Sequence, residues 1–224
     1  MKIVEVETIP LAIPFTHGGK PAGWGGKAWT SLSILLVKVT TEAGVTGYGE
    51  AFSYNCLRPV QTAFDDMVAP IIVGEEVDDI GIFLGEVQQK LHLFGRYGIL
   101  MFALSGLDIA LWDIAAKTVN MPLWKLLGER KQDRLPAYAS LYRYGEPEIV
   151  AERCSQAIGE GYGSIKLHET EDREVAAARE TIGEGFPIML DTNCPWTVAE
   201  AHKRAASLRQ FRLHWLEEPI FPPE

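Results

Sequence analysis

Three short apolar stretches of the chain each end in polar or charged residues: Ser164-Ile-Lys-Leu-His168, Ile188-Met-Leu-Asp-Thr-Asn193 and His214-Trp-Leu-Glu-Glu-Pro219. They recur at intervals of 25 and 26 residues, counted from Lys166 to Asp191 and from Asp191 to Glu217. This interval suits a repeating unit of a strand, a helix and two loops, as in a parallel barrel or a doubly wound sheet. Because the carboxyl ends of parallel barrel strands face one way, we expect these three side chains to converge on one mouth.

The residue types at these strand ends suggest metal and acid–base chemistry. Lys166 and His168 are two residues apart, so a strand turns them to the same side. Asp191 and Glu217 offer the hard oxygen donors that Mg²⁺ prefers, and Asn193 can add a hydrogen bond or a ligand. We predict Lys166 and His168 as catalytic residues and the two carboxylates as metal ligands. The structural alternative is that Asp191 caps a loop, Glu217 pairs with an arginine, and the other two form structural ion pairs.

Lys166 lies in an apolar strand, where a lysine is rarely buried without a partner. Near a dication and aromatic walls its pKa is expected to fall towards a value useful for a base. His168 titrates close to neutral pH even when unperturbed. Glu218 is expected to be an outer partner of Lys166.

Composition limits the classes of function. The chain has 224 residues, of which 47% are hydrophobic, so it can form one large domain or two smaller ones. A net charge of −9 without a basic run argues against nucleic acid and anionic membrane as partners. Residues 1–15 contain no uninterrupted apolar run, which predicts neither a signal peptide nor a membrane span, and we expect a cytoplasmic protein. The three cysteines lack CxxC spacing, and the chain has no P-loop, GxSxG or HExxH motif.

The first part of the chain, residues 1–125, is expected to form an α+β domain. Alternation of apolar residues predicts strands at 1–14, 31–41 and 45–51, and three helical patterns follow at 59–72, 79–93 and 98–119. Residues 15–30 contain five glycines with His17 and Trp24, and they are a candidate lid or else a surface loop. His17, Trp24 and, from the loop at 53–58, Tyr54 are predicted substrate contacts.

Residues 126–224 are expected to form an α/β domain, because strand and helix patterns alternate there. A strand is predicted at 135–140, and Pro147 opens the helix that follows. A further helix is predicted at 171–182, and Thr197 and Glu200 form a capping box for the next one.

Five stretches resemble the mandelate racemase and muconate lactonizing enzyme group of the enolase superfamily. They are Ala103-Leu-Ser-Gly-Leu-Asp-Ile-Ala-Leu-Trp-Asp-Ile-Ala-Ala-Lys117, Pro122-Leu-Trp-Lys-Leu-Leu-Gly128, the Lys166-x-His168 strand, Met189-Leu-Asp-Thr-Asn193 and Trp215-Leu-Glu-Glu-Pro219. The long helical motif and the Trp-Leu-Glu-Glu-Pro strand are highly specific in this order, whereas Lys-x-His alone is weak.

The resemblance implies a capping domain whose glycine-rich loop closes over a TIM-like (β/α)₇β barrel. It implies that Asp191 and Glu217 bind Mg²⁺, and that the Lys-x-His strand carries the base that removes a proton next to a carboxylate, as in this superfamily in general. The function expected from it is a Mg²⁺-dependent acid-sugar dehydratase, or a related racemase or cycloisomerase, acting on a small hydroxy-acid carboxylate. The group is commonly homo-oligomeric.

Two departures from the family pattern affect these expectations. His168 stands where the family usually has a second lysine, so either His168 or Lys166 can be the base. A third carboxylate ligand and a second acid/base, expected about 25 residues and more beyond the fourth strand, are not in these 224 residues. We therefore expect about half of a barrel, belonging to a longer enzyme, completed by another chain, or remaining as a relic. We expect weak Mg²⁺ binding and no turnover by this chain alone; the alternative function is a non-catalytic half-barrel acting as an assembly or interaction module.

Overall fold

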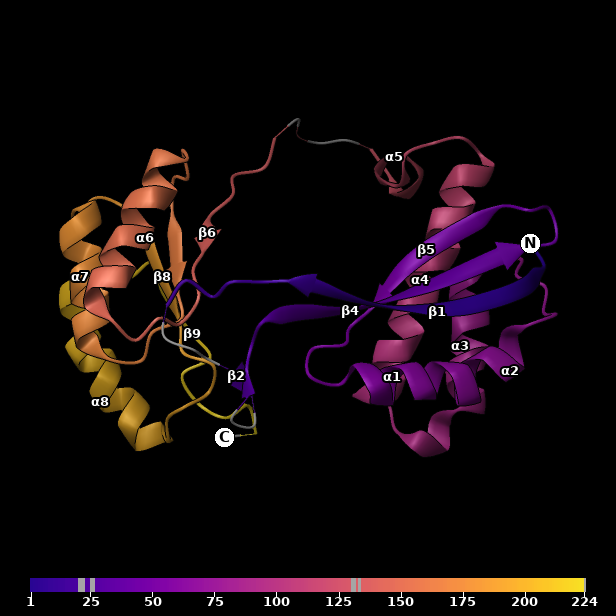
Figure 1. Cartoon of the computed structure of the whole chain (residues 1–224), viewed down its shortest axis with the longest axis horizontal. Coiled ribbons are helices and arrows are strands. Elements are labelled where there is room, and N and C mark those ends of the chain that lie inside the picture. Colours follow the sequence, from indigo (N-terminus) through magenta and orange to yellow (C-terminus); the bar gives the residue numbers. More distant parts are fainter. Residues whose placement is uncertain (20–22, 25–26, 130–131, 133, 224) are drawn as a thin grey trace. The chain divides into compact units, whose positions relative to one another are not determined.

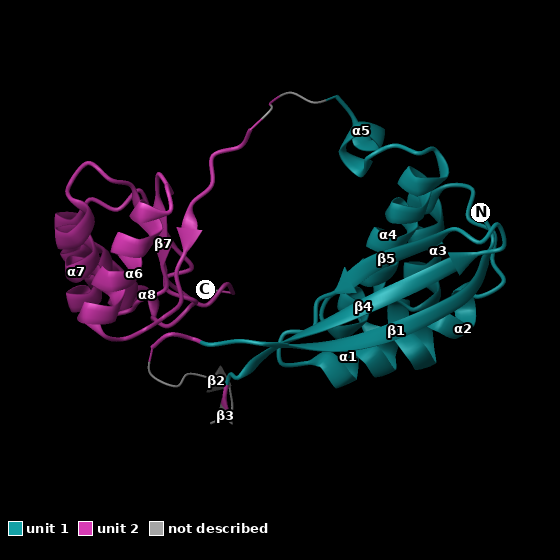
Figure 2. Cartoon of the chain, turned by 45° about the horizontal axis from the view of Figure 1, so that its top comes forward, with its two compact units in different colours: residues 1–16, 29–131 teal, residues 17–28, 132–224 magenta. Residues whose placement is uncertain are grey.

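A computed structural model describes residues 1–19, 23–24, 27–129, 132 and 134–223. The chain divides into two compact units (Figure 2). Unit 1 comprises residues 1–16 and 29–131, and unit 2 comprises residues 17–28 and 132–224. Most of the glycine-rich segment therefore groups with the second half of the chain. The domain limits 1–125 and 126–224 stay a prediction.

Unit 1 is built on an antiparallel sheet of order β1-β4-β5, with β1 at Ile3–Pro14, β4 at Ser31–Thr41 and β5 at Thr46–Ala51 (Figure 1). The pairing of β1 with β4 runs from Ile3↔Thr41 to Pro14↔Ser31. Alternate residues of β4, including Leu35, Val37 and Val39, are fully buried. This period of two gives the sheet one face for the core, as the alternation in the sequence predicts.

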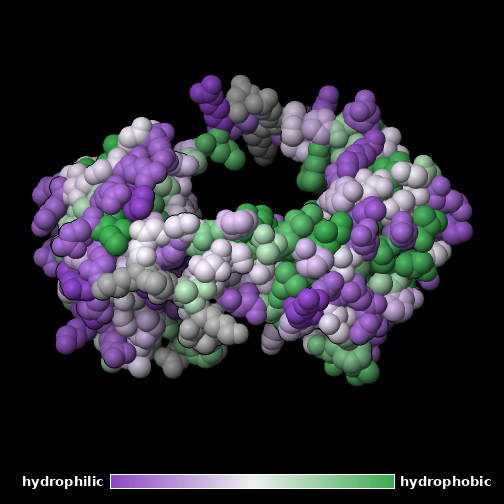
Figure 3. All heavy atoms as spheres, viewed as in Figure 1, coloured by the Kyte–Doolittle hydropathy of each residue, from purple (hydrophilic) through white to green (hydrophobic). Residues whose placement is uncertain are grey.

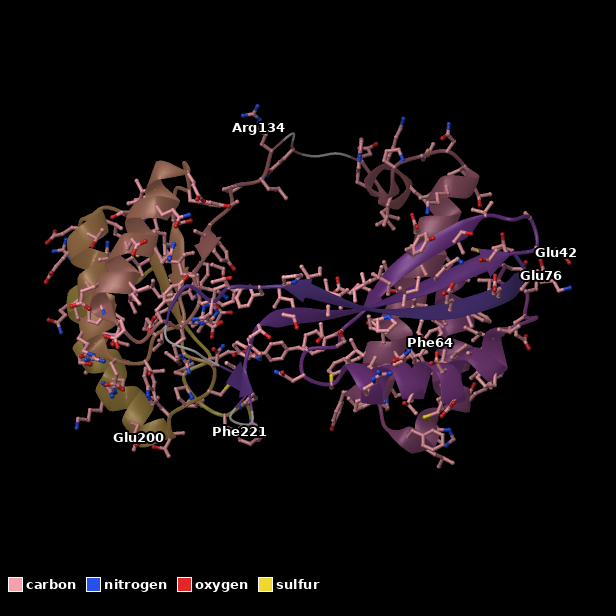
Figure 4. All side chains as sticks on the ribbon, in the orientation of Figure 1. Glu42, Phe64, Glu76, Arg134, Glu200 and Phe221 are labelled. Carbon is pink, nitrogen blue, oxygen red and sulfur yellow. The ribbon has the colours of Figure 1, made fainter. Side chains whose placement is uncertain are left out.

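Helices cover the buried face of this sheet. They are α1 (Leu57–Ala63), a π-helical turn (Phe64–Val68), α2 (Ala69–Ile72), α3 (Ile80–Lys90), a 3-10 turn (His92–Phe94), α4 (Ile99–Thr118) and α5 (Leu123–Leu127). Phe64, labelled in Figure 4, is fully buried in the core of unit 1. By length and composition α4 could cross a membrane, but half of its most apolar window is buried in the protein. Its packing is that of a core helix, as its apolar circumference predicts.

Unit 2 contains a parallel sheet of order β6-β7-β8-β9. Its strands are β6 (Ala139–Ser140), β7 (Ile165–Leu167), β8 (Ile188–Asp191) and β9 (Trp215–Glu217). The connecting helices are α6 (Pro147–Gly159), α7 (Asp172–Ile182) and α8 (Val198–Leu208), followed by a 3-10 turn (Arg209–Phe211), and they lie on one side of the sheet (Figure 1). A short antiparallel pair, β2 (Gly23–Trp24) and β3 (Lys27–Ala28), also belongs to this unit. An antiparallel α+β unit followed by four parallel barrel-type strands confirms the predicted fold class.

In unit 2 one predicted strand is shorter than expected, and one predicted helix cap is present. The strand predicted at 135–140 is reduced to Ala139–Ser140, because Pro136 has no N–H for a ladder and Leu135 is 79% exposed. The capping box is confirmed: the amide of Glu200 (labelled in Figure 4) donates to Thr197 Oγ1, and the Glu200 carboxylate accepts from the Thr197 amide at 2.9 Å.

Each unit has its own hydrophobic core. Fully buried aliphatic residues of the sheet and α4 form the core of unit 1, and those of β7, β8 and the facing helices form the core of unit 2. Apolar residues also appear on the surface of unit 1 (Figure 3), where β1 and β4 expose Leu11, Ile13 and Leu32.

Candidate active site

The carboxyl ends of β7, β8 and β9 bring the predicted side chains together. In the parallel register Lys166 pairs with Met189, and Asp191 pairs directly with Glu217. Leu167 is buried in the core, so its neighbours Lys166 and His168 turn the other way. The predicted convergence at one end of the sheet is therefore present in unit 2.

Asp191 is at the centre of this cluster. Its Oδ2 lies 3.2 Å from Lys166 Nζ and 3.3 Å from His168 Nε2. Glu217 Oε2 lies 3.5 Å from the same Lys166 nitrogen. The side chains of Lys166 and Asp191 are 12% and 8% exposed, whereas that of Glu217 is 37% exposed. One carboxylate thus sits inside the protein and the other at its edge.

The pKa of Lys166 is raised above its ordinary value. Burial lowers this pKa, but the hydrogen bond and charge of Asp191 and the charge of Glu217 outweigh burial. The ring of Tyr138, 5.8 Å from Nζ, adds a cation–π contact. The direction follows from the two carboxylates that face the ammonium group. The lowering expected beside a bound dication stays a prediction.

The imidazole of His168 is held in one orientation. Its Nδ1 lies 2.5 Å from the carbonyl oxygen of Leu141. A carbonyl can only accept, so Nδ1 carries a proton and donates it. Nε2 is therefore the nitrogen that faces Asp191 and can give or take a proton.

The two carboxylates are also fixed by hydrogen bonds from neighbouring residues. Asp191 Oδ1 accepts from the Asn193 amide at 3.1 Å and from Asn193 Nδ2 at 2.8 Å. Asn193 has a φ of 56°, a left-handed conformation that asparagine tolerates. Trp215 Nε1 donates to Glu217 Oε2 at 2.9 Å. Asp191 thus caps its own loop with one oxygen and serves the site with the other.

The remaining predicted site residues lie elsewhere. The Glu218 carboxylate forms no ion pair with Lys166, although both residues are described; instead its carbonyl accepts from the Cys194 amide at 2.7 Å. His17 is buried in unit 2 with its ring 5.4 Å from that of Tyr142. The side chain of Trp24 and residues 20–22 and 25–26 lie outside the described part. Tyr54 belongs to unit 1, where it contacts Trp29. The substrate contacts stay predictions.

Sequence reasoning did not identify Arg143, which follows β6. Its Nε donates to the His168 carbonyl at 2.5 Å, and its Nη2 donates to the Thr192 carbonyl at 2.9 Å. A signal was present, because Arg143, His168 and Asn193 are spaced by 25 residues. Arg143 thus occupies, in the preceding repeat, the position that His168 and Asn193 occupy in theirs.

The donor set fits a hard dication in type and is incomplete in number. Asp191 and Glu217 present carboxylate oxygens on adjacent strand ends, as Mg²⁺ requires. Among the described residues, no group of three or more histidine, cysteine, aspartate or glutamate side chains could hold a metal ion. Any further ligands would have to be water, substrate oxygens or residues outside this set.

Two family models match the chain. The mandelate racemase/muconate lactonizing enzyme N-terminal domain matches residues 20–128, and the enolase C-terminal domain-like model matches residues 149–224. The chain belongs to the mandelate racemase/muconate lactonizing enzyme group of the enolase superfamily. This membership explains why an antiparallel α+β unit is followed by parallel strands that alternate with helices.

Several relatives of the chain are named as enzymes that act on sugar acids. The chain is 34% identical over 208 residues to the 3,6-anhydro-alpha-L-galactonate cycloisomerase of Streptomyces coelicolor, a match that covers 88% of this chain and 56% of that one. A racemase from S. coelicolor A3(2), solved with bound magnesium, matches with a TM-score of 0.85 at 29% identity, over 99% of this chain and 64% of that one. L-talarate/galactarate dehydratase from Salmonella typhimurium LT2, liganded with Mg and L-lyxarohydroxamate, has a TM-score of 0.84 at 27% identity, over 98% and 59%. The chain spans about half the length of the curated relatives it matches.

Proposed function

We propose that this chain carries the metal-binding and proton-transfer half of a Mg²⁺-dependent enzyme that removes a proton next to a carboxylate. The observation that carries the proposal is the meeting of Lys166 Nζ and His168 Nε2 at one oxygen of Asp191, with Glu217 within 3.5 Å of the same lysine. Two nitrogens suited to proton transfer therefore adjoin two oxygens suited to a dication.

Asp191 and Glu217 are the residues that would hold the metal. A bound Mg²⁺ would stabilise the second negative charge that develops on a substrate carboxylate when the neighbouring carbon loses its proton. The hydrogen bonds from Asn193 to Asp191 and from Trp215 to Glu217 fix both carboxylates before any ligand arrives. Membership in the group and the magnesium-bound relatives support this assignment.

His168 is the better candidate for the base. Its Nδ1 proton is given to the Leu141 carbonyl, which leaves Nε2 as the only ring atom that can accept a proton. Lys166 is a cation held by two carboxylates, and a protonated amine cannot accept a further proton. Lys166 is instead suited to orient Asp191 and to donate a proton or a hydrogen bond to a substrate oxygen.

The substrate class we propose is a hydroxy-acid carboxylate of the acid-sugar type. Relatives are named as arabinonate dehydratase, L-talarate/galactarate dehydratase and D-galactarolactone cycloisomerase, which supports dehydration or isomerisation of such acids. No comparison supports the alternative of a non-catalytic assembly module. A homo-oligomer, a cytoplasmic location, and His17, Trp24 and Tyr54 as substrate contacts remain parts of the proposal to be tested.

Magnesium titration tests the proposal. The chain is expected to bind Mg²⁺ weakly, and Asp191→Asn and Glu217→Gln are each expected to abolish the binding measured by calorimetry. Glu184→Gln is the matched control, because Glu184 is exposed and forms an ion pair with Arg212 at the surface, away from Asp191 and Glu217. Binding that survives both site substitutions would remove the metal assignment, and no binding together with a stable self-complementing dimer would favour the assembly module.

A further inference from the structure

The backbone ladder between β7 and β8 stops just before His168 and Asp191. Its last paired residues are Leu167 and Leu190. Beyond that point Arg143 joins the two strand ends, since its Nε donates to the His168 carbonyl and its Nη2 to the Thr192 carbonyl, 2.9 Å away. A planar guanidinium can make two such bonds in a fixed geometry, which sets the separation of the two chains.

The same short segment reaches both members of the His168–Asp191 pair. Arg143 Nη2 lies 3.4 Å from Asn193 Oδ1, and the amide nitrogen of that side chain donates to Asp191 Oδ1 at 2.8 Å. Two residues before Arg143, the Leu141 carbonyl accepts the Nδ1 proton of His168. Residues 141–143 thus hold the ring of His168 on one side and the carboxylate of Asp191 on the other.

The contacts of Arg143 are unusual for a surface arginine. Its side chain is exposed, yet among the residues that the structure describes it forms no ion pair within 4.0 Å. Its three hydrogen bonds to described residues go to oxygens of His168, Thr192 and Asn193. These bonds therefore tie Arg143 to the two strand ends that carry His168 and Asp191.

We propose that Arg143 is a positioning residue for proton transfer, which keeps His168 Nε2 next to the carboxylate of Asp191. The inference rests on the proposed function, and it adds a residue from the loop after β6 to the site. Partners that orient a metal ligand typically change metal affinity about 10- to 100-fold when they are removed. Arg143→Met, which keeps the aliphatic stem and removes the donors, is expected to weaken Mg²⁺ binding in that range.

The test uses the full chain with Arg143→Met, Arg143→Lys and the control Arg209→Met. Arg209 is exposed in the turn before β9, and its side chain makes no hydrogen bond or ion pair to a described residue. One measurement is Mg²⁺ titration. The other is the NMR signal of the proton on Nδ1 of His168, recorded at fixed pH in protein with ¹⁵N-labelled histidine. The melting temperature of each variant shows whether it is folded.

Arg143→Met is expected to lose the slowly exchanging Nδ1 proton signal of His168 and to weaken Mg²⁺ binding. Arg143→Lys is expected to keep part of the signal and part of the affinity. Arg209→Met is expected to change neither the signal nor the affinity. If Arg143→Met lowers only the melting temperature while both readouts stay as in the control, Arg143 is a structural clamp and the inference is wrong. If the unsubstituted chain binds no Mg²⁺ but Arg143→Met still loses the His168 signal, the positioning role stands and the metal assignment fails.

Discussion

Gly49 of β5 and Gly106 of α4 bring the two backbones into direct contact. A side-chain carbon added at Gly49 would overlap the carbonyl oxygen of Gly106 and lie 2.7 Å from the amide nitrogen of Ala110. One added at Gly106 would lie 2.7 Å from a methyl carbon of Val37. Strand and helix can approach this closely only because both positions lack a β carbon.

Gly49→Ala should therefore destabilise unit 1. The added methyl group meets backbone atoms that cannot rotate away, so the free energy of unfolding should fall by about 1–3 kcal/mol or more. Gly85→Ala is the matched control, because nothing lies within 4 Å of a carbon added there, inside α3. That variant should gain up to about 1 kcal/mol of helix stability. Equal effects of the two substitutions in denaturant unfolding would contradict the close-contact argument.

Arg179 should be essential for the stability of unit 2. Its guanidinium donates to four carbonyls, those of Phe211, Gly183, Phe186 and Arg212, at 2.7–3.2 Å. The bond to Phe211 is buried and the other three are part-buried. Arg179→Met leaves these acceptors without their donor, at about 1–3 kcal/mol for each one that water cannot reach. We expect a loss of at least about 2 kcal/mol in urea unfolding. Arg209→Met should change the midpoint little, and a matching result for both variants would show that these four bonds contribute nothing.

Cys154 should report the opening of unit 2. Burial raises the pKa of its thiol to about 12, and the side chain is fully buried in α6. At pH 8 the folded protein should therefore not be alkylated at Cys154, because neither thiolate nor access is available. Mass spectrometry of peptides after timed alkylation should show modification of the partly exposed Cys56 and Cys194 first. Cys154 should react only as denaturant unfolds unit 2; rapid alkylation without denaturant would refute its burial.

Glu169 should make stability fall as pH rises. Burial raises the pKa of its carboxyl above the ordinary 4.5; the Tyr144 and Gly145 amides counteract this in part, and nearby Glu174 adds to it. The folded state then holds the proton more tightly than the unfolded state. The contribution to stability is complete below 4.5 and is lost as pH rises through the raised pKa. The free energy of unfolding of the unsubstituted protein, minus that of Glu169→Gln, should decrease across this window, and a difference that rises with pH would contradict the assignment.

The sequence predicts most of the fold because its periods are strong. Alternation in β1 and β4 and the apolar circumference of α4 each follow from which face is buried. The repeat of about 25 residues predicts that Lys166, Asp191 and Glu217 meet, and in unit 2 they do. The first parallel strand is shorter than predicted because periodicity does not register the missing amide of Pro136.

The protonation and orientation of the side chains in the site are harder to predict from the sequence than which residues meet there. The raised pKa of Lys166 depends on how two carboxylates approach its nitrogen, and the orientation of His168 depends on the carbonyl of Leu141. Main-chain acceptors carry no side-chain signature, so no motif reveals them. Arg143 could have been found by extending the repeat one unit back, since its spacing from His168 is the same 25 residues.

The cores of the two units share no residues, so damage to one half need not spread to the other. A substitution that melts the antiparallel sheet should leave the paired acids and the histidine in place. Substitutions in the core of unit 1 can therefore accumulate without changing the side chains that meet at the carboxyl ends of β7, β8 and β9 in unit 2.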